Sequence, residues 1–168
     1  MTMSPAASPS ADRATDGHES FLPESTVLIV DDNEQNVELL QAYLEALPVT
    51  VAVARDGVEA LEQVRAVEPD LILLDIMMPR MSGFQVCREV KSDPATQDIQ
   101  ILTVTALNEL GDVERAAECG TDDFVSKPVN KFELLTRVRS LLRVRHLKGE
   151  LERAMRYAAE VEDTVADV

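Results

Sequence analysis

The sequence predicts an α/β fold built on a doubly wound, five-stranded parallel sheet. Short apolar segments alternate along the chain with amphipathic segments of helical period, and short loops join them. This alternation is typical of βα repeats. Some apolar segments, such as Leu71–Leu74, carry no polar residue on either face, as expected for strands that helices cover on both sides.

The local pattern places each element of this fold. Short apolar or alternating segments predict strands over residues 27–30, 49–53, 70–75, 99–105 and 124–128. Apolar residues at helical spacing predict helices over residues 34–47, 57–67, 84–90 and 108–119. We expect Pro48 to end the first of these helices and Gly120 to cap the last.

A long helix closes the sequence, from Lys131 to about Val165. Asn130 is a favourable N-cap, and Glu133 stands where a capping-box partner belongs. The first 24 residues are rich in Ser, Pro and Ala, a composition that cannot bury a core. We therefore divide the chain into a disordered leader (1–24), a folded domain (25–145) and a C-terminal helical extension (146–168).

The net charge disfavours two classes of partner. The chain has 16 basic and 31 acidic residues, hence a formal charge of −15. Nucleic-acid binding needs clustered Lys and Arg, and anionic membranes repel an acidic chain, so we expect neither partner. The sequence has no apolar span and no secretory signal. Cys87 and Cys119 lack the spacing of a metal or redox pair, so we expect a cytoplasmic protein with reduced cysteines.

Polar side chains follow four of the predicted strands at the point where each strand ends. In an open doubly wound sheet, ligands bind at the carboxyl ends of the strands. That rule brings together three carboxylates, a hydroxyl and an ammonium group, from Asp31, Asp32, Asp75, Thr105 and Lys127. Taken singly, each has an ordinary structural explanation as a helix cap, a strand former or a surface lysine. The joint arrangement favours a site.

This set of groups predicts phosphoryl chemistry. Three adjacent carboxylates repel one another unless a cation intervenes, and Mg²⁺ prefers such oxygen ligands. A carboxylate is also a competent nucleophile towards phosphorus. A hydroxyl and an ammonium group can neutralise the oxygens of the transferred group. The sequence therefore predicts transfer of a phosphoryl group onto an aspartate.

Four segments resemble the receiver domain of bacterial two-component response regulators. They are VLIVDDN at 27–33, DLILLDIMMPRMSG at 70–83, ILTVTA at 101–106 and GTDDFVSKPV at 120–129. They stand in the family's order and spacing, and the likeness leaves out only the two ends of the chain. The resemblance implies a flavodoxin-like fold with strand order 2-1-3-4-5.

The resemblance also implies a role for each site residue. It makes Asp75 the phosphoacceptor, with Mg²⁺ held by Asp31, Asp32, Asp75 and the backbone carbonyl of Met77. Thr105 and Lys127 would contact the phosphoryl group, and the Lys127–Pro128 bond would be cis. Phe124 matches the aromatic switch residue that turns inward when Thr105 moves. Apolar side chains at Met77 and Leu107 imply slow self-dephosphorylation.

The expected function is that of a response regulator receiver. It would accept a phosphoryl group on Asp75 from a histidine kinase or a histidine phosphotransfer protein, and signal through protein contacts to a downstream target that the sequence does not name. It would promote only its own phosphorylation and dephosphorylation, and so would not be an enzyme in the usual sense. Two alternatives are a degenerate receiver acting as a scaffold and a small aspartyl-phosphate phosphatase. The phosphatases that resemble haloacid dehalogenases carry Asp-x-Asp after the first strand, whereas this chain has Asp31-Asp32 there.

The extension contains an apolar seam. Steps of three and four residues alternate along Val144, Leu147, Leu151, Ala154, Ala158, Val161, Val165 and Val168. This is the a/d pattern of a coiled coil over about three heptads. A parallel or antiparallel homodimer, folding back onto the domain, and fraying all remain open at this stage.

Overall fold

The protein forms one parallel sheet flanked by helices. The computed structural model describes residues 22–106, 114, 115 and 117–167. In this part of the chain the sheet has the order β2-β1-β3-β4-β5, and every pairing is parallel. The strands are β1 (Ser25–Val30), β2 (Val49–Ala54), β3 (Leu71–Leu74), β4 (Gln100–Thr105) and β5 (Asp123–Ser126). The predicted doubly wound fold and its strand order are confirmed.

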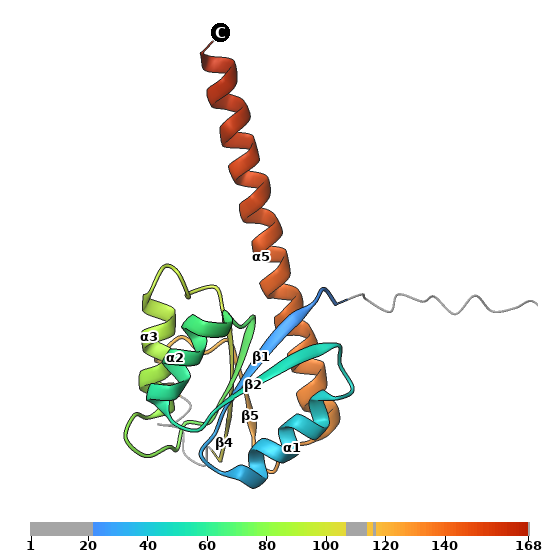
Figure 1. The fold of residues 1–168 in the computed structure, drawn as a ribbon, viewed down its shortest axis with the longest axis vertical. Helices are drawn as coiled ribbons and strands as arrows, with labels where there is room; N and C mark the ends of the chain where they lie inside the picture. The colour runs from blue at the N-terminus through green and yellow to red at the C-terminus, as the bar shows by residue number, and fades with distance from the viewer. Residues whose placement is uncertain (1–21, 107–113, 116, 168) are drawn as a thin grey trace, which may run out of the picture.

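Helices pack on both faces of this sheet (Figure 1). The helices of the described residues are α1 (Glu34–Leu44), α2 (Gly57–Val67), α3 (Gly83–Ser92) and α5 (Lys131–Ala166). One core cluster joins α1 and α5 to one face of the sheet, and a second joins α2 and α3 to the other. Most of the helix predicted over residues 108–119 lies outside the described residues. Gly120, expected to cap it, has a φ of 91°, which suits glycine.

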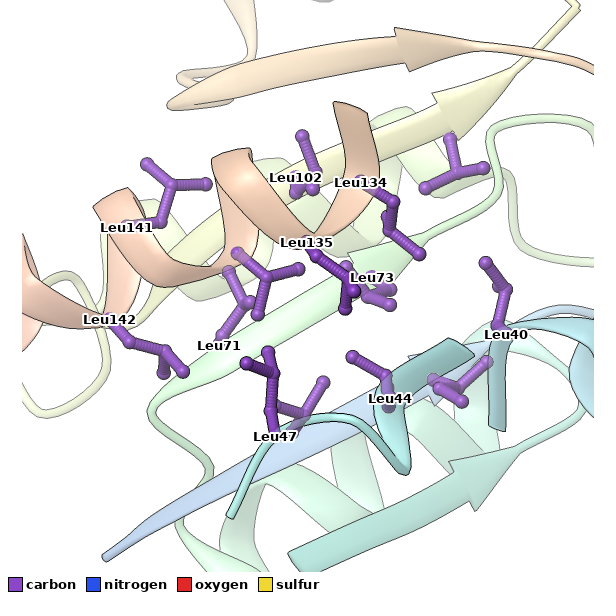
Figure 2. Close-up of a cluster of buried hydrophobic side chains, with 14 of the residues drawn as sticks. Leu40, Leu44, Leu47, Leu71, Leu73, Leu102, Leu134, Leu135, Leu141 and Leu142 are labelled. Carbon is purple, nitrogen blue, oxygen red and sulfur yellow. The ribbon is translucent and has the colours of Figure 1, made fainter. Parts of the chain in front are cut away.

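Alternation along the central strands builds the two clusters. Val27 and Ile29 of β1 belong to the cluster under α1 and α5, whereas Leu28 and Val30 belong to the other. Successive side chains of a strand point to opposite faces, so an entirely apolar strand supplies both cores. Figure 2 shows the first cluster, where leucines of α1 and α5 meet those of β3 and β4.

The first helix is shorter than the sequence predicts. It ends at Leu44 rather than Leu47. The Leu47 N–H donates to the Leu44 carbonyl at 2.9 Å, which closes a tight turn. Leu47 also precedes Pro48, and the proline ring disfavours the helical conformation of the residue before it. Leu47 is nevertheless buried in the core, so its apolar side chain is explained by packing and not by membership of the helix.

Helix α5 has an anchored half and an exposed half. Its Asn130 side chain accepts a bond from the Glu133 N–H at 3.0 Å, as expected of the N-cap, while the Glu133 carboxylate pairs with Arg137 at 3.3 Å. The anchored half buries Leu134, Leu135, Val138, Leu141 and Leu142. Every described residue from position 150 to 167 is exposed, and this half projects beyond the sheet (Figure 1).

One residue of the expected leader packs on the folded domain. Residues 1–21 of the predicted leader lie outside the described residues, but Leu22 is buried in the first core cluster. Ser25, at the start of β1, hydrogen-bonds His146 of α5 through Oγ and Nε2 at 2.8 Å. Among the described helices, not one combines the length and apolar character that crossing a membrane requires.

The two cysteines are buried and form no disulfide with each other. The two residues are far apart in sequence but in contact in the structure. The Cys87 thiol donates to the Cys119 carbonyl oxygen at 3.2 Å. This bond ties α3 to the turn before β5.

Candidate phosphoryl-transfer site

Four strands deliver the predicted site residues to one edge of the sheet. Asp31 and Asp32 directly follow β1, Asp75 directly follows β3, Thr105 ends β4 and Lys127 directly follows β5. The parallel register sets Val30 beside Leu74, so the residues after them are also neighbours. The sheet thus brings together the residues that the strand-end rule selects.

The three carboxylates form a cluster. One oxygen from each of Asp31, Asp32 and Asp75 lies within 4.8 Å of the others. Asp31 and Asp75 are 1% and 5% exposed, while Asp32 stands at the surface. Oδ2 of Asp31 is buried and has no hydrogen-bond partner among the described residues. A buried charged oxygen without a hydrogen-bond partner is costly, and a cation bound to it would offset that cost.

Lys127 supplies the nearest positive charge. Its Nζ lies 3.6 Å from Oδ2 of Asp31 and 3.5 Å from Oδ2 of Asp75. Both separations exceed those of a good charge-assisted hydrogen bond. The ammonium group therefore lies between the two buried carboxylates without closing tightly on either.

Two backbone N–H groups fix the orientation of the buried carboxylates. The Asn33 N–H donates to Oδ1 of Asp31 at 2.8 Å, and the Met77 N–H donates to Oδ1 of Asp75 at 3.1 Å. Each donor lies two residues after its acceptor, which is the pattern of an Asx turn. With Oδ1 held in this way, each carboxylate directs Oδ2 towards Lys127. Asn33 is not among the predicted site residues, although an Asx turn after a strand is a recognisable signal.

The pKa of Asp75 records the electrostatics of this cluster. Burial and the neighbouring charge of Asp31 raise the pKa of Asp75 from 3.8 to about 6. Lys127 and the Met77 N–H lower it, but less strongly. In addition, three carboxylates cluster beside this one lysine, so the site holds more negative charge than Lys127 balances. A hard divalent cation such as Mg²⁺ fits this surplus of oxygen donors.

Gly83 allows the loop after Asp75 to close beneath the site. Its N–H donates to the Ile76 carbonyl at 3.0 Å. A Cβ at this position would lie 2.7 Å from the Ile76 Cα and collide with the Asp75 carbonyl oxygen. A side chain here would displace the backbone that carries Asp75, so this glycine is a structural part of the site. Gly83 ends the segment 70–83 that carries the family resemblance, but this close contact was not predicted.

The remaining predicted residues occupy different environments. Thr105 is 1% exposed, and its carbonyl accepts a bond from the Lys127 N–H at 3.1 Å. The Lys127–Pro128 bond is cis, as the resemblance implies. Phe124 on β5 is 40% exposed, and Met77 is 75% exposed beside the acidic cluster. Leu107 lies outside the described residues.

This geometry agrees with the comparison with known protein families. Residues 27–139 match the family model of the response regulator receiver domain. The chain belongs to this family. The matched segment contains every predicted site residue and the anchored start of α5. It ends before the exposed half of that helix.

Relatives of the receiver support this assignment. Response regulator PleD of Caulobacter vibrioides is 46% identical over 125 residues, which cover 74% of this chain and 28% of PleD. Response regulator MprA of Mycobacterium ulcerans is 40% identical, covering 74% of this chain and 53% of MprA. This chain thus spans about a quarter to a half of these relatives. The crystal structure of a histidine kinase signal receiver domain from Syntrophus aciditrophicus is 36% identical, with a TM-score of 0.67, covering 71% of this chain and 90% of that one.

Proposed function

We propose that this receiver takes a phosphoryl group onto Asp75 and uses the change to control protein contacts. The observation that carries the proposal is the pair of buried carboxylates, Asp31 and Asp75, with Lys127 Nζ 3.6 and 3.5 Å from them. The donor would be a phosphohistidine on a histidine kinase or phosphotransfer protein. We propose that the reaction takes place in the cytoplasm and that the chain turns over no other substrate.

In this proposal an oxygen of the Asp75 carboxylate attacks phosphorus. An O–P bond forms, the P–N bond of the donor breaks, and the donor imidazole leaves with the electron pair. Asp31, Asp32, Asp75 and the Met77 carbonyl would hold Mg²⁺, which when bound neutralises charge on the phosphoryl oxygens. Lys127 would donate to one of those oxygens, and the buried Thr105 hydroxyl to another.

The switch would begin at Thr105 and end at Phe124. Both residues belong to adjacent strands, β4 and β5, and Phe124 is only partly covered. Movement of Thr105 towards the phosphoryl group would open space into which the ring turns. Such a two-state element converts one local contact into a changed surface.

The test is phosphorylation by acetyl phosphate in the presence of Mg²⁺, read by intact mass. The wild-type chain should gain one phosphoryl group, and Asp75→Asn should gain none. Omitting Mg²⁺ with a chelator present should abolish the gain. If the wild type gains no mass and binds no beryllofluoride, the chain is a scaffold and the proposal is wrong.

The lifetime of the phosphorylated form is a second readout. Met77 places an apolar, exposed side chain at the mouth of the site, and a carboxylate or amide there could instead orient an attacking water. We therefore propose a half-life of minutes or longer after removal of the donor. Loss within seconds, without a phosphatase, would contradict this part of the proposal.

A further inference from the structure

The exposed half of α5 carries an apolar stripe with nothing packed against it in the described chain. Val144 and Val161 are 39% and 44% exposed, and Leu147, Leu151 and Val165 are more exposed still. The helix continues without a break to Ala166 and stands clear of the domain (Figure 1). An isolated helical segment of this length is marginal in water, so packing against a partner would stabilise it.

The charges along this segment are not mixed but sorted. Residues 143–148 include Arg143, Arg145 and Lys148, a charge of +3, whereas residues 159–168 include Glu160, Glu162, Asp163 and Asp167, a charge of −4. Arg145 already pairs with Asp70 of the domain, with its Nε 3.7 Å from Oδ1. The stretch between them, 149–158, has two acidic and two basic residues and is neutral. The helix therefore has a basic end next to the domain and an acidic end away from it.

This order is unfavourable for the helix by itself. The last turns of a helix carry partial negative charge, which basic side chains complement and acidic ones oppose. The last turn of α5 has no basic residue. A partner that brings positive charge to this end would remove the conflict.

A second copy of the chain supplies that charge only when it runs in the opposite direction. In a parallel pair the basic ends would lie together, with Arg143 beside Lys148 of the second copy, and the acidic ends would also meet. In an antiparallel pair each basic end lies against an acidic end, and the two helix dipoles oppose each other.

The apolar seam has a register that agrees with this orientation. In an antiparallel coiled coil, a positions of one helix lie opposite d positions of the other. Leu147 then lies opposite Val165 of the second copy, and Leu151 lies opposite Val161 of the second copy. Ala154 then meets Ala158 of the second copy at the centre, where small side chains permit a close approach. Flanking this seam, Lys148 faces Glu162 of the second copy, and Met155 faces its own equivalent.

From this combination of seam and charge we infer that residues 147–165 pair with the same segment of a second copy as an antiparallel coiled coil. The two receiver domains would then lie at opposite ends, with their Val144 residues about 36 Å apart along the axis at 1.5 Å per residue. The inference extends the proposed function by naming a partner for the helix. It does not depend on phosphoryl transfer, so every test below uses unphosphorylated protein and also Asp75→Asn.

Single cysteine substitutions separate the two orientations. Met155→Cys should form a disulfide-linked dimer under mild oxidation, because antiparallel pairing sets residue 155 opposite itself. Leu151→Cys should not, since the two equivalents then lie about 15 Å apart along the axis. The wild type controls for its buried native cysteines. Cross-linking of Leu151→Cys but not Met155→Cys would establish a parallel pair and overturn the inference.

Charge and seam variants test whether this surface holds the dimer, by sedimentation of the full chain. Glu162→Lys should weaken the dimer about tenfold, because two attractive pairs become repulsive. Adding Lys148→Glu to that variant should restore it. Val161→Glu should abolish it, whereas the matched Ala159→Glu, on the outer face of the same turn, should not. A wild type that stays monomeric at high concentration, or a dimer indifferent to Val161→Glu, would overturn the inference.

Discussion

The receiver domain and the projecting half of α5 use the same kinds of side chain under opposite conditions. In the domain, Asp75 is 5% exposed and its pKa rises to about 6, and Leu142 is completely buried. In the projecting half, Leu151 is 60% exposed and Asp163 stands in water. The chemistry of the first region comes from burial. The second region has only a periodic apolar stripe and an ordered sequence of charges. These side chains form an interface only when a partner covers them.

Helix α5 belongs to both regions, because it runs without a break from the domain into the projecting half. Its anchored half supplies five buried residues to the core, and its N-cap Asn130 fixes where it starts. The projecting half contributes nothing to that core. The same helix therefore packs on the sheet in its first half and extends into solvent in its second half. Substitutions in the first half should change the stability of the domain, and substitutions in the second half should not.

The largest expected effect comes from shortening a leucine in each half. Leu142→Ala should lower the free energy of unfolding by about 2–5 kcal/mol, because it leaves a cavity in the core. Leu151→Ala should change it by less than about 0.5 kcal/mol in the monomer, where that side chain is exposed. Urea denaturation at low protein concentration measures both. Equal losses would show that the projecting half packs on the domain in solution.

A smaller effect on the free energy of unfolding, which depends on pH, should distinguish the buried carboxylates of the site from the exposed carboxylates of the projecting half. A raised pKa means that the folded protein prefers protonated Asp75, so this residue costs stability as pH rises from about 4 through 6. Asp75→Asn removes that cost. Without Mg²⁺ it should stabilise the protein by about 1–3 kcal/mol at pH 7.5 and by close to nothing at pH 4.

The matched control for this titration is Asp163→Asn. It removes the same charge from an exposed position, so its effect should be below about 0.5 kcal/mol at either pH. Added Mg²⁺ should stabilise the wild type and not Asp75→Asn, since the ion binds only the folded state with its ligands intact. A stabilisation by Asp75→Asn that does not vary with pH would mean that packing, and not charge, is responsible.

The sequence was sufficient for the sheet and for the residues at its edge. Apolar strands such as Leu71–Leu74 can be buried only between two layers of helices, and parallel strands end at one edge, so Asp31, Asp75 and Lys127 had to converge. The cis bond before Pro128 came with the family resemblance. Each of these features can be predicted from the residues of one strand or one motif, without knowledge of distant contacts.

What local patterns missed depends on contacts between distant segments. Leu47 fits the helical period of the residues before it, but it is buried by the turn that leads to Pro48. Leu22 lies in a segment whose composition suggests disorder, yet it packs on the core. The need for glycine at position 83 arises from the Asp75 carbonyl opposite it. A sequence pattern records none of these neighbours.

Gly149→Ala should give the smallest effect and tests where one region ends and the other begins. A Cβ at Gly149 would have no neighbour within 4 Å, so the substitution adds no contact and changes only helix propensity, by about 1 kcal/mol. This should increase amide-exchange protection of residues 150–166 about fivefold and leave the urea midpoint of the domain unchanged. Ala159→Gly, in the exposed half, should lower that protection by a similar factor. If Gly149→Ala instead shifts the midpoint of the domain by its full propensity gain, the projecting half unfolds together with the domain, and the boundary placed at the end of the buried leucines is wrong.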